Sequence, residues 1–196
     1  MPYIDLAFRI TGTSVPVDHG YALYAAISRI APEIHNARAI GVQPIRGVYD
    51  GNGSLHLTDS SRLILRLPDD QIRTYLKLAG KKLEIDGHSL RVGVPEVRTL
   101  RPTASLRARL VTIKGFLEET SFLEAAKRQL QSLEVNGDLQ LGDRRTFRVK
   151  DKQVVGFEVA ITSLTAEESL TLQEHGLGGR RRMGCGAFVS AERRST

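Results

Sequence analysis

The residues "YIDLAFRI" (3–10) and "DHGYALYAAISRIA" (18–31) decide how the chain begins to fold. The first stretch alternates apolar and polar side chains, which predicts a strand with one buried face. The second repeats apolar side chains at helical spacing, with Asp18 placed to cap its first turn and Pro32 just after its last residue. The chain therefore opens with a strand and a helix that can cover one face of a sheet.

The rest of the first half completes a six-element pattern. Strand patterns over 39–49 and 55–68 flank a glycine-containing turn, and a short helix is predicted over 69–79. A hairpin is then predicted over 81–97, turning at its Asp-Gly pair. The order is β-α-β-β-α-β with the final strand doubled, which matches the ferredoxin-like unit.

The same order repeats after the linker "TLRPTAS" (99–105). The predicted elements are a strand over 107–116, a helix over 120–135 capped by Thr120 or Ser121, two or three strands within 138–164, a helix that starts at the capping box Thr165-x-x-Glu168, and a strand over 186–192. The predicted fold class is α+β, with two tandem ferredoxin-like (RRM-like) βαββαβ domains over 1–100 and 106–196. A single larger α+β domain is the alternative.

Composition narrows the class of protein without fixing its function. The 196 residues have a net charge of +6 and a pI near 9.7, which is compatible with a polyanionic partner but also occurs without one. The single cysteine, Cys185, leaves no intrachain disulfide and no thiolate metal cage. No signal peptide is evident, and no segment approaches the roughly 20 apolar residues of a membrane span. We expect a soluble, cytoplasmic protein.

A glycine- and arginine-rich loop, "GLGGRRRMGCG" (176–186), joins the last predicted helix to the last strand. It lacks the Gly-Lys-Ser/Thr ending of a Walker A loop, and it follows a helix, whereas a dinucleotide fingerprint follows a strand. Its amides and guanidinium groups suit phosphate, but a glycine-rich turn with exposed charges is an equal alternative. The candidate RNA-binding residues in it are Gly176, Gly178, Gly179, Gly184, Gly186, Arg180, Arg181 and Arg182.

A second basic segment, "RRTFRVKDK" (144–152), favours the phosphate-binding interpretation. Its cations alternate along a predicted strand or hairpin, with Phe147 and Val149 facing the other way, and Lys114 on the domain's first strand extends the same surface. An ordinary solvated face is the alternative. Aromatic residues make up 6% of the chain, too few for stacking platforms, so backbone and groove contacts are expected. The candidates here are Arg144, Arg145, Arg148, Lys150 and Lys152.

The five histidines show no metal-binding spacing, so neither a metal nor a cofactor is predicted. His56 and His88 are expected at the surface, and His175 at the end of a helix, where it suits the dipole. His19 lies in the first turn of the first helix and can anchor that turn. His35 follows the helix in a loop and is well placed for acid–base chemistry near neutral pH.

These features together resemble a known family. The loop within "GLGGRRRMGCGAF" (176–188), between the last helix and strand of a second ferredoxin-like domain, resembles that of the CRISPR-associated (Cas) endoribonucleases of family six, in the RAMP superfamily. The first helix, "DHGYALYAAI" (18–27), is similar to the family's first helix, and "IKGF" (113–116) and "RVKDKQVVGFEV" (148–159) add to the likeness. The resemblance covers nearly the whole chain.

The resemblance implies metal-independent cleavage of precursor CRISPR RNA within its repeats. A ribose 2′-OH would attack the adjacent phosphate and leave a 2′,3′-cyclic phosphate and a 5′-OH, with a repeat stem-loop as the RNA partner. The family's catalytic histidine aligns with His35, and His19 is second choice. Members that also use a helix tyrosine have it at the place of Ser28, with Tyr24 one turn earlier. The rivals are a non-catalytic guide-RNA-binding subunit of a CRISPR effector complex and a ferredoxin-like protein unrelated to RNA.

Overall fold

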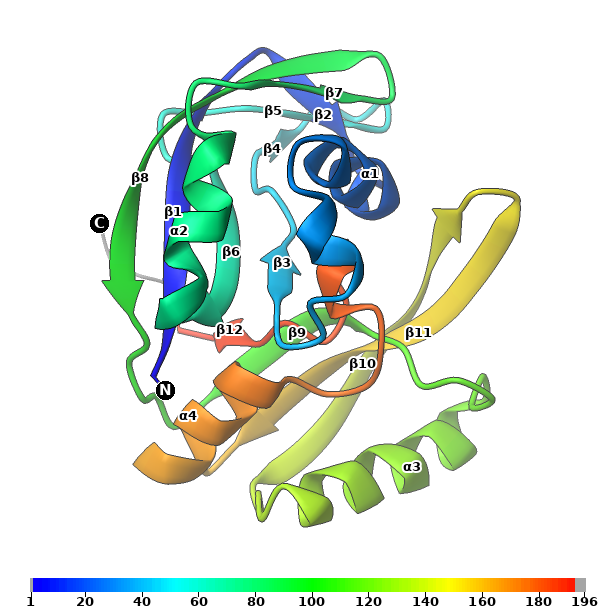
Figure 1. The fold of residues 1–196 in the computed structure, drawn as a ribbon. Coiled ribbons are helices and arrows are strands. Elements are labelled where there is room, and N and C mark those ends of the chain that lie inside the picture. Colours follow the sequence, from blue (N-terminus) through cyan, green and yellow to red (C-terminus); the bar gives the residue numbers. More distant parts are fainter. Residues whose placement is uncertain (1, 193–196) are drawn as a thin grey trace. The chain divides into compact units, whose positions relative to one another are not determined.

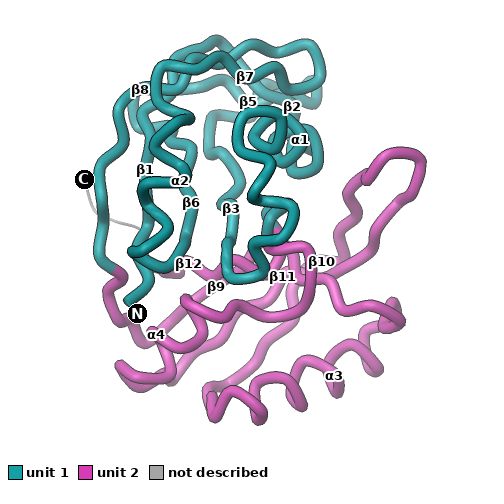
Figure 2. Tube along the Cα trace, in the orientation of Figure 1, with its two compact units in different colours: residues 1–99, 182–184 teal, residues 100–181, 185–196 magenta. Residues whose placement is uncertain are grey.

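The structure, a computed structural model, describes residues 2–192 (Figure 1). It divides into two compact units (Figure 2). Unit 1 holds the residues up to Thr99 together with Arg182–Gly184, and unit 2 holds Leu100–Arg181 and the residues from Cys185 on.

Unit 1 is built on a five-stranded antiparallel sheet in the order β3-β6-β1-β8-β7. A small second sheet has the order β2-β5-β4. Both helices cover one face of the large sheet (Figure 1) and share its apolar core. The elements are β1 (Tyr3–Thr11), β2 (Ser14–Pro16), α1 (Gly20–Ile30), the 3-10 turn η1 (Pro32–His35), β3 (Gly41–Gln43), β4 (Val48–Tyr49), β5 (Ser54–His56), β6 (Arg62–Pro68), η2 (Asp69–Gln71), α2 (Ile72–Tyr75), η3 (Leu76–Leu78), β7 (Lys82–Ile85) and β8 (His88–Thr99).

Unit 2 has a four-stranded antiparallel sheet in the order β10-β11-β9-β12. Its two helices share one core with the sheet, in which the Phe122 and Phe157 ring centroids lie 4.8 Å apart. The elements are β9 (Leu106–Val111), α3 (Glu119–Ser132), β10 (Asp138–Val149), β11 (Lys152–Thr162), α4 (Ala166–His175), the 3-10 turn η4 (Arg181–Met183) and β12 (Val189–Ser190).

Both units follow the same topology. In each, the first strand of the βαββαβ order (β1 or β9) lies between the third and the fourth, and the second strand lies at an edge. Strand β7 extends the sheet of unit 1, as the doubled final strand predicts. The α+β class and the ferredoxin-like pair are therefore confirmed, because apolar periodicity and turn residues are local signals that this small fold obeys.

Several predicted helix starts are wrong. Helix α1 has His19 at its N-cap in place of Asp18, and the His19 side chain makes no capping hydrogen bond. Helix α3 begins one residue before Thr120, with Glu118 at its N-cap, and the Ser121 hydroxyl bonds back to the Glu118 carbonyl. The helix predicted over 69–79 is only one α-turn between two 3-10 turns. The residue at each helix cap depends on tertiary packing, and the local sequence does not determine it.

The predicted capping box of α4 is present and reaches further than predicted. Thr165 Oγ1 accepts from the Glu168 amide, and the Glu168 carboxylate accepts from the Thr165 amide at 2.8 Å. The same carboxylate accepts the Asn136 amide at 2.8 Å, which ties the helix to the residues before β10. These hydrogen bonds, the one from the Thr165 amide first, lower the pKa of Glu168 from 4.5 to about 2.

Replacing Glu168 with glutamine should therefore destabilise unit 2 in a pH-dependent way. The folded-state pKa lies below the unfolded value, so the contribution of the carboxylate is present above pH 4.5 and is lost as the pH falls toward 2. Urea unfolding should give a lower midpoint for Glu168→Gln at pH 7, with the difference shrinking below pH 4.5. Glu167→Gln, in the same exposed first turn, is the control. A constant difference at every pH would contradict the assignment.

Candidate active site and nucleic-acid interface

Tyr24 and His35 form a hydrogen-bonded pair in unit 1. Tyr24 Oη lies 2.6 Å from His35 Nδ1, and the two rings meet edge to face with centroids 5.6 Å apart. Helix α1 presents the tyrosine, and the histidine is the last residue of η1, which continues the chain directly after the helix. His35 is exposed.

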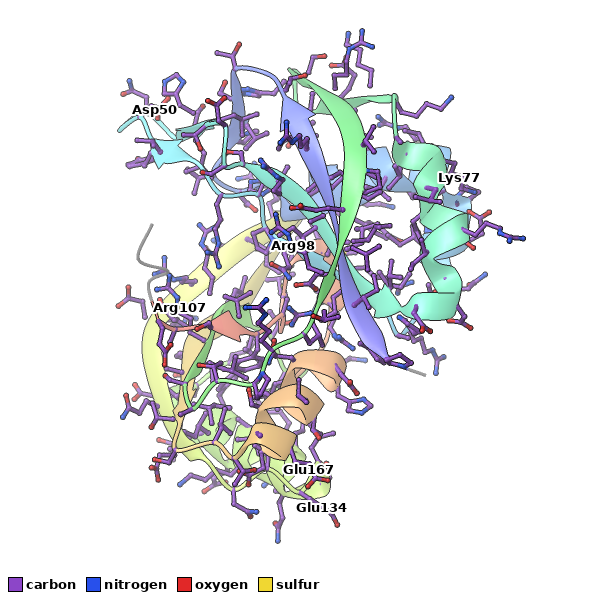
Figure 3. All side chains as sticks on the ribbon, turned by 90° about the vertical axis from the view of Figure 1, so that its left-hand side faces the viewer. Asp50, Lys77, Arg98, Arg107, Glu134 and Glu167 are labelled. Carbon is purple, nitrogen blue, oxygen red and sulfur yellow. The ribbon has the colours of Figure 1, made fainter. Side chains whose placement is uncertain are left out.

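The turn that carries His35 is anchored through the two residues before the histidine. Ile34 is fully buried in the core of unit 1, which anchors the middle of the turn. Lys77 Nζ lies 2.6 Å from Glu33 Oε1, and the hydrogen bond from Lys77 lowers the pKa of Glu33. Figure 3 shows Lys77 on the side of the sheet that bears the helices, with Arg98 on the opposite side. An exposed histidine on a firmly held backbone is a suitable acid–base group.

His19, the second candidate, is used inside the fold. It is 1% exposed, its Nδ1 lies 2.7 Å from the Pro16 carbonyl, and its Nε2 lies 2.9 Å from the Ile45 amide nitrogen. Since an amide can only donate and a carbonyl can only accept, these partners assign the neutral tautomer with the proton on Nδ1. The ring thus joins β2 to the residues after β3, and both of its nitrogens are occupied.

Ser28 takes no part in the Tyr24–His35 pair. Its hydroxyl donates to the Ala25 carbonyl at 2.9 Å, within the helix that also carries Tyr24. Tyr24, one turn earlier, is the residue whose hydroxyl reaches His35. The helix tyrosine in this chain therefore occupies a different turn from the one implied by the family alignment.

The glycines of the loop 176–186 allow close backbone contacts. Gly176, Gly178 and Gly186 have φ angles of 65°, 72° and 64°. A side chain at any of them would begin 2.4 Å or less from a carbonyl oxygen. The Gly178, Gly179 and Gly186 amides donate to Gln129 Oε1, the Thr112 carbonyl and the Leu110 carbonyl, at 2.8 to 2.9 Å. These three amides serve the packing of unit 2, so they do not form a phosphate cradle.

The three consecutive arginines of this loop point to different surroundings. Arg181 folds back to donate to the Glu174 carbonyl at the end of α4, where a cation suits the helix dipole. Arg182 belongs to unit 1, where it donates to the carbonyls of Ile34 and His35. Arg180 is exposed. Arg181 and Arg182 are neighbours in η4, and a 3-10 turn advances about 120° per residue, so their side chains leave it in different directions.

The basic segment 144–152 forms the outer part of the β10–β11 hairpin. Pairing with β9 stops at Phe157, so beyond it the two strands pair only with each other. Residues opposite one another share a face, which places Arg144 and Arg148 on one face and Lys152, opposite Val149, on the other. The prediction that the alternating cations Arg144, Arg148, Lys150 and Lys152 share a face is wrong, because Lys150 with its φ of 53° turns the chain between the strands.

Two further basic candidates differ from the prediction. Lys114 is exposed, but it follows the end of β9 in a turn closed by the Phe116 amide and the Ile113 carbonyl. Arg145 is half-buried and pairs with Glu158 at 2.8 Å and with Asp143 at 3.3 Å, across an irregularity in the β10–β11 register. Arg145 is therefore neutralised within the sheet, whereas Lys114 stays at the surface.

Comparison with known proteins identifies the family of the chain. Residues 4–193 match the sequence profile described as "Cas6 Crispr". A curated protein of Myxococcus xanthus (strain DK1622), named "CRISPR-associated endonuclease Cas6", is 43% identical over 189 residues, which cover 96% of this chain and 82% of that protein. The chain belongs to the Cas6 family.

Solved structures of Cas6-type proteins share its fold at low sequence identity. The structure titled "Characterization of a Cas6-related gene from Pyrococcus furiosus" matches with a TM-score of 0.68 at 14% identity, covering 98% of this chain and 100% of that one. Thermus thermophilus Cse3 "bound to an RNA representing a pre-cleavage complex" matches with a TM-score of 0.54 at 14% identity and the same coverage. These matches support two ferredoxin-like units in this Cas6-family chain.

Sequence reasoning missed the role of two charged residues in this Cas6-family site. Lys77 pairs with Glu33 from 44 residues away, and Arg182 reaches the His35 carbonyl from 147 residues away. Neither carries a local signal, because surface lysines and arginines are common. Among residues 2–192, no group of three His, Cys, Asp or Glu side chains could hold a metal ion. No helix in that range is long and apolar enough to cross a membrane.

The two histidines should respond differently to substitution. His19→Ala leaves the buried Ile45 amide and Pro16 carbonyl unpaired and opens a cavity, so it should lower the free energy of unfolding by about 2–4 kcal/mol. His35→Ala removes an exposed ring and should change that free energy by about 0.5 kcal/mol or less. Guanidinium unfolding monitored by circular dichroism measures both. Equal losses in the two variants would contradict the structural assignment of His19.

Proposed function

We propose that this chain is an endoribonuclease that cleaves precursor CRISPR RNA within its repeats and releases guide RNA, with no metal ion in the reaction. The observation that carries the proposal is the 2.6 Å contact between Tyr24 Oη and His35 Nδ1, in a chain 43% identical to a protein named as a Cas6 endonuclease. We assign catalysis to a domain formed by residues 1–100 and RNA binding to a domain formed by residues 106–196.

The reaction needs two proton transfers. The ribose 2′-oxygen forms a bond to phosphorus while the bond from phosphorus to the 5′-oxygen breaks, leaving a 2′,3′-cyclic phosphate and a 5′-OH. A base takes the proton of the 2′-OH, and an acid gives a proton to the departing 5′-oxygen. An imidazole with a pKa ordinarily near 6.5 can perform either transfer at neutral pH, so His35 needs no metal-bound hydroxide.

Tyr24 binds Nδ1 of His35 and leaves Nε2 as the reacting nitrogen. When His35 is the acid, the ring is an imidazolium: Nδ1–H donates to Tyr24 Oη, and Nε2–H gives its proton to the 5′-oxygen. When His35 is the base, the neutral ring keeps its proton on Nδ1, which donates to Tyr24 Oη, and the Nε2 lone pair accepts the proton of the 2′-OH. In both cases Nε2 is the reacting atom and Tyr24 is the residue that sets the tautomer and the ring plane.

The proposed RNA surface consists of exposed cations of unit 2. Guanidinium and ammonium groups bind the phosphates of a stem, and an RNA stem is read through its backbone and its wide minor groove. Arg145 and Arg181 are half-buried and bond protein acceptors, so we do not assign them to phosphates. The exposed candidates are Lys114, Arg144, Arg148, Lys150, Lys152 and Arg180, of which Lys152 lies on the opposite face of the hairpin from Arg144 and Arg148.

The catalytic assignment is tested by single-turnover cleavage of labelled repeat RNA in EDTA. His35→Ala should lower the rate at saturating protein by about 10²- to 10⁴-fold while changing the RNA Kd less than about threefold. Tyr24→Phe should lower it about tenfold, the equivalent of one hydrogen bond of about 1.4 kcal/mol. His56→Ala, another exposed histidine of unit 1, is the control. Undiminished cleavage by His35→Ala would remove this residue from the mechanism.

The same assay distinguishes the proposed endoribonuclease from the two alternative functions. A non-catalytic guide-RNA-binding subunit would bind the repeat tightly and leave it intact. A protein unrelated to RNA would show no salt-dependent affinity for the repeat. Cleavage in EDTA to a product ending in a cyclic phosphate would support the enzyme.

The RNA surface is tested through salt dependence. Arg144→Gln and Arg148→Gln should each weaken repeat binding and reduce the slope of log Kd against log salt by about 1, because each removes about one phosphate contact. The control is Lys127→Gln on the exposed side of α3. Unchanged slopes in both arginine variants would exclude this face of the hairpin as the RNA surface.

A further inference from the structure

Arg182 lies against the turn that carries His35. Its Nη1 donates to the Ile34 carbonyl at 2.8 Å and also to the His35 carbonyl. Its guanidinium carbon lies 5.8 Å from the centre of the Tyr24 ring, within the range of a cation–π contact. One side chain thus touches the backbone of His35 and the ring of the residue that bonds its imidazole.

The segment Arg182–Gly184 is itself held firmly in unit 1. A side chain at Gly20, the first residue of α1, would begin 2.3 Å from the Met183 carbonyl oxygen. Gly184, with a φ of 86°, lies where a side chain would meet Pro44 Cγ at 3.1 Å. Two glycines therefore let this short segment lie directly on the start of α1 and on Pro44. These contacts restrain the backbone of Arg182, whose side chain extends to the turn.

Arg182 donates to the backbone carbonyls at the end of η1. The last carbonyls of a helical turn lack partners within the turn, and a guanidinium can satisfy two of them at once. The Tyr75 hydroxyl is buried nearby and has no hydrogen-bond partner among the described residues. Burial raises the pKa of Tyr75 to about 12, with the Glu33 carboxylate adding to the rise and Arg182 opposing it. The positive charge of Arg182 thus acts on Tyr75 as well.

We propose that Arg182 is a positioning residue for the Tyr24–His35 pair, and that it acts on cleavage through His35 and not as a phosphate ligand. The inference rests on the proposed function. The bond to the His35 carbonyl restrains the backbone of that residue, and the contact with the Tyr24 ring restrains its partner. A displacement of a reacting group by about 1 Å can cost about 10²-fold in rate, so such restraint matters for catalysis.

The kinetic test separates positioning from phosphate binding. Arg182→Ala should lower the single-turnover rate at saturating protein by about 10- to 100-fold. Its Kd for repeat RNA and the salt slope of that Kd should stay close to wild type. Arg182→Lys should recover most of the rate, because an ammonium can still donate to both carbonyls. Arg73→Ala, an exposed arginine on α2, is the matched control in unit 1.

A second measurement needs neither RNA nor cleavage. In the Arg182→Ala protein, amide hydrogen exchange over residues 34–37 should accelerate by about tenfold, because the turn opens more often. The amides of Asn36 and Ala37 report on it directly, since they donate to the Glu33 and Ile34 carbonyls. Exchange in Arg180→Ala should match wild type in this turn, while that variant binds RNA more weakly.

The outcomes distinguish the two ideas. A raised Kd with a normal saturated rate and normal exchange in Arg182→Ala would overturn the positioning role and make Arg182 an RNA ligand. A lowered rate with accelerated exchange supports it. If His35→Ala still cleaves, the proposed catalytic role of His35 fails, whereas accelerated exchange would still support the contact between Arg182 and the turn.

Discussion

Close backbone contact at the glycines of the loop 176–186 is the constraint on which the arrangement of its arginines depends. At Gly176 and Gly178 a carbonyl oxygen lies 2.4 Å from the position of a first side-chain atom, and at Gly186 the distance is 2.0 Å. No other residue type fits there, and the positive φ angles also favour glycine. The base of the loop closes through the hydrogen bond from the Leu177 amide to the Gly186 carbonyl at 3.3 Å.

Several arginines of this basic chain bond acceptors within the protein and are therefore less available to a nucleic acid. Arg66 and Asp5 form a buried ion pair at 2.8 Å on the sheet of unit 1, and Arg145 pairs with Glu158 in unit 2. Arg181 and Arg182 donate to backbone carbonyls. A guanidinium has five donors in a rigid plane, which makes it suitable for such internal contacts as well as for phosphates. The proposed RNA surface is correspondingly smaller than the net charge suggests.

His19 and His35, both in unit 1, differ in burial and in hydrogen-bond partners. His19 is buried, and both of its ring nitrogens bond backbone groups, so it stabilises the fold. His35 is exposed and bonded to Tyr24 through one nitrogen. The same side chain is thus a buried cross-link in one place and an exposed hydrogen-bonding group in the other.

The sequence by itself determined the repeated βαββαβ order, the capping box of α4 and the place of the glycine loop between the last helix and the last strand. These features depend on residues that are only a few positions apart. It did not determine the face of Lys152, which depends on where the hairpin turns. The tertiary structure alone decided that Tyr24 meets His35 and that Arg182 reaches the same turn from 147 residues away. Contacts between residues so far apart in the sequence depend on the packing of the whole unit, and no local pattern of residues encodes them.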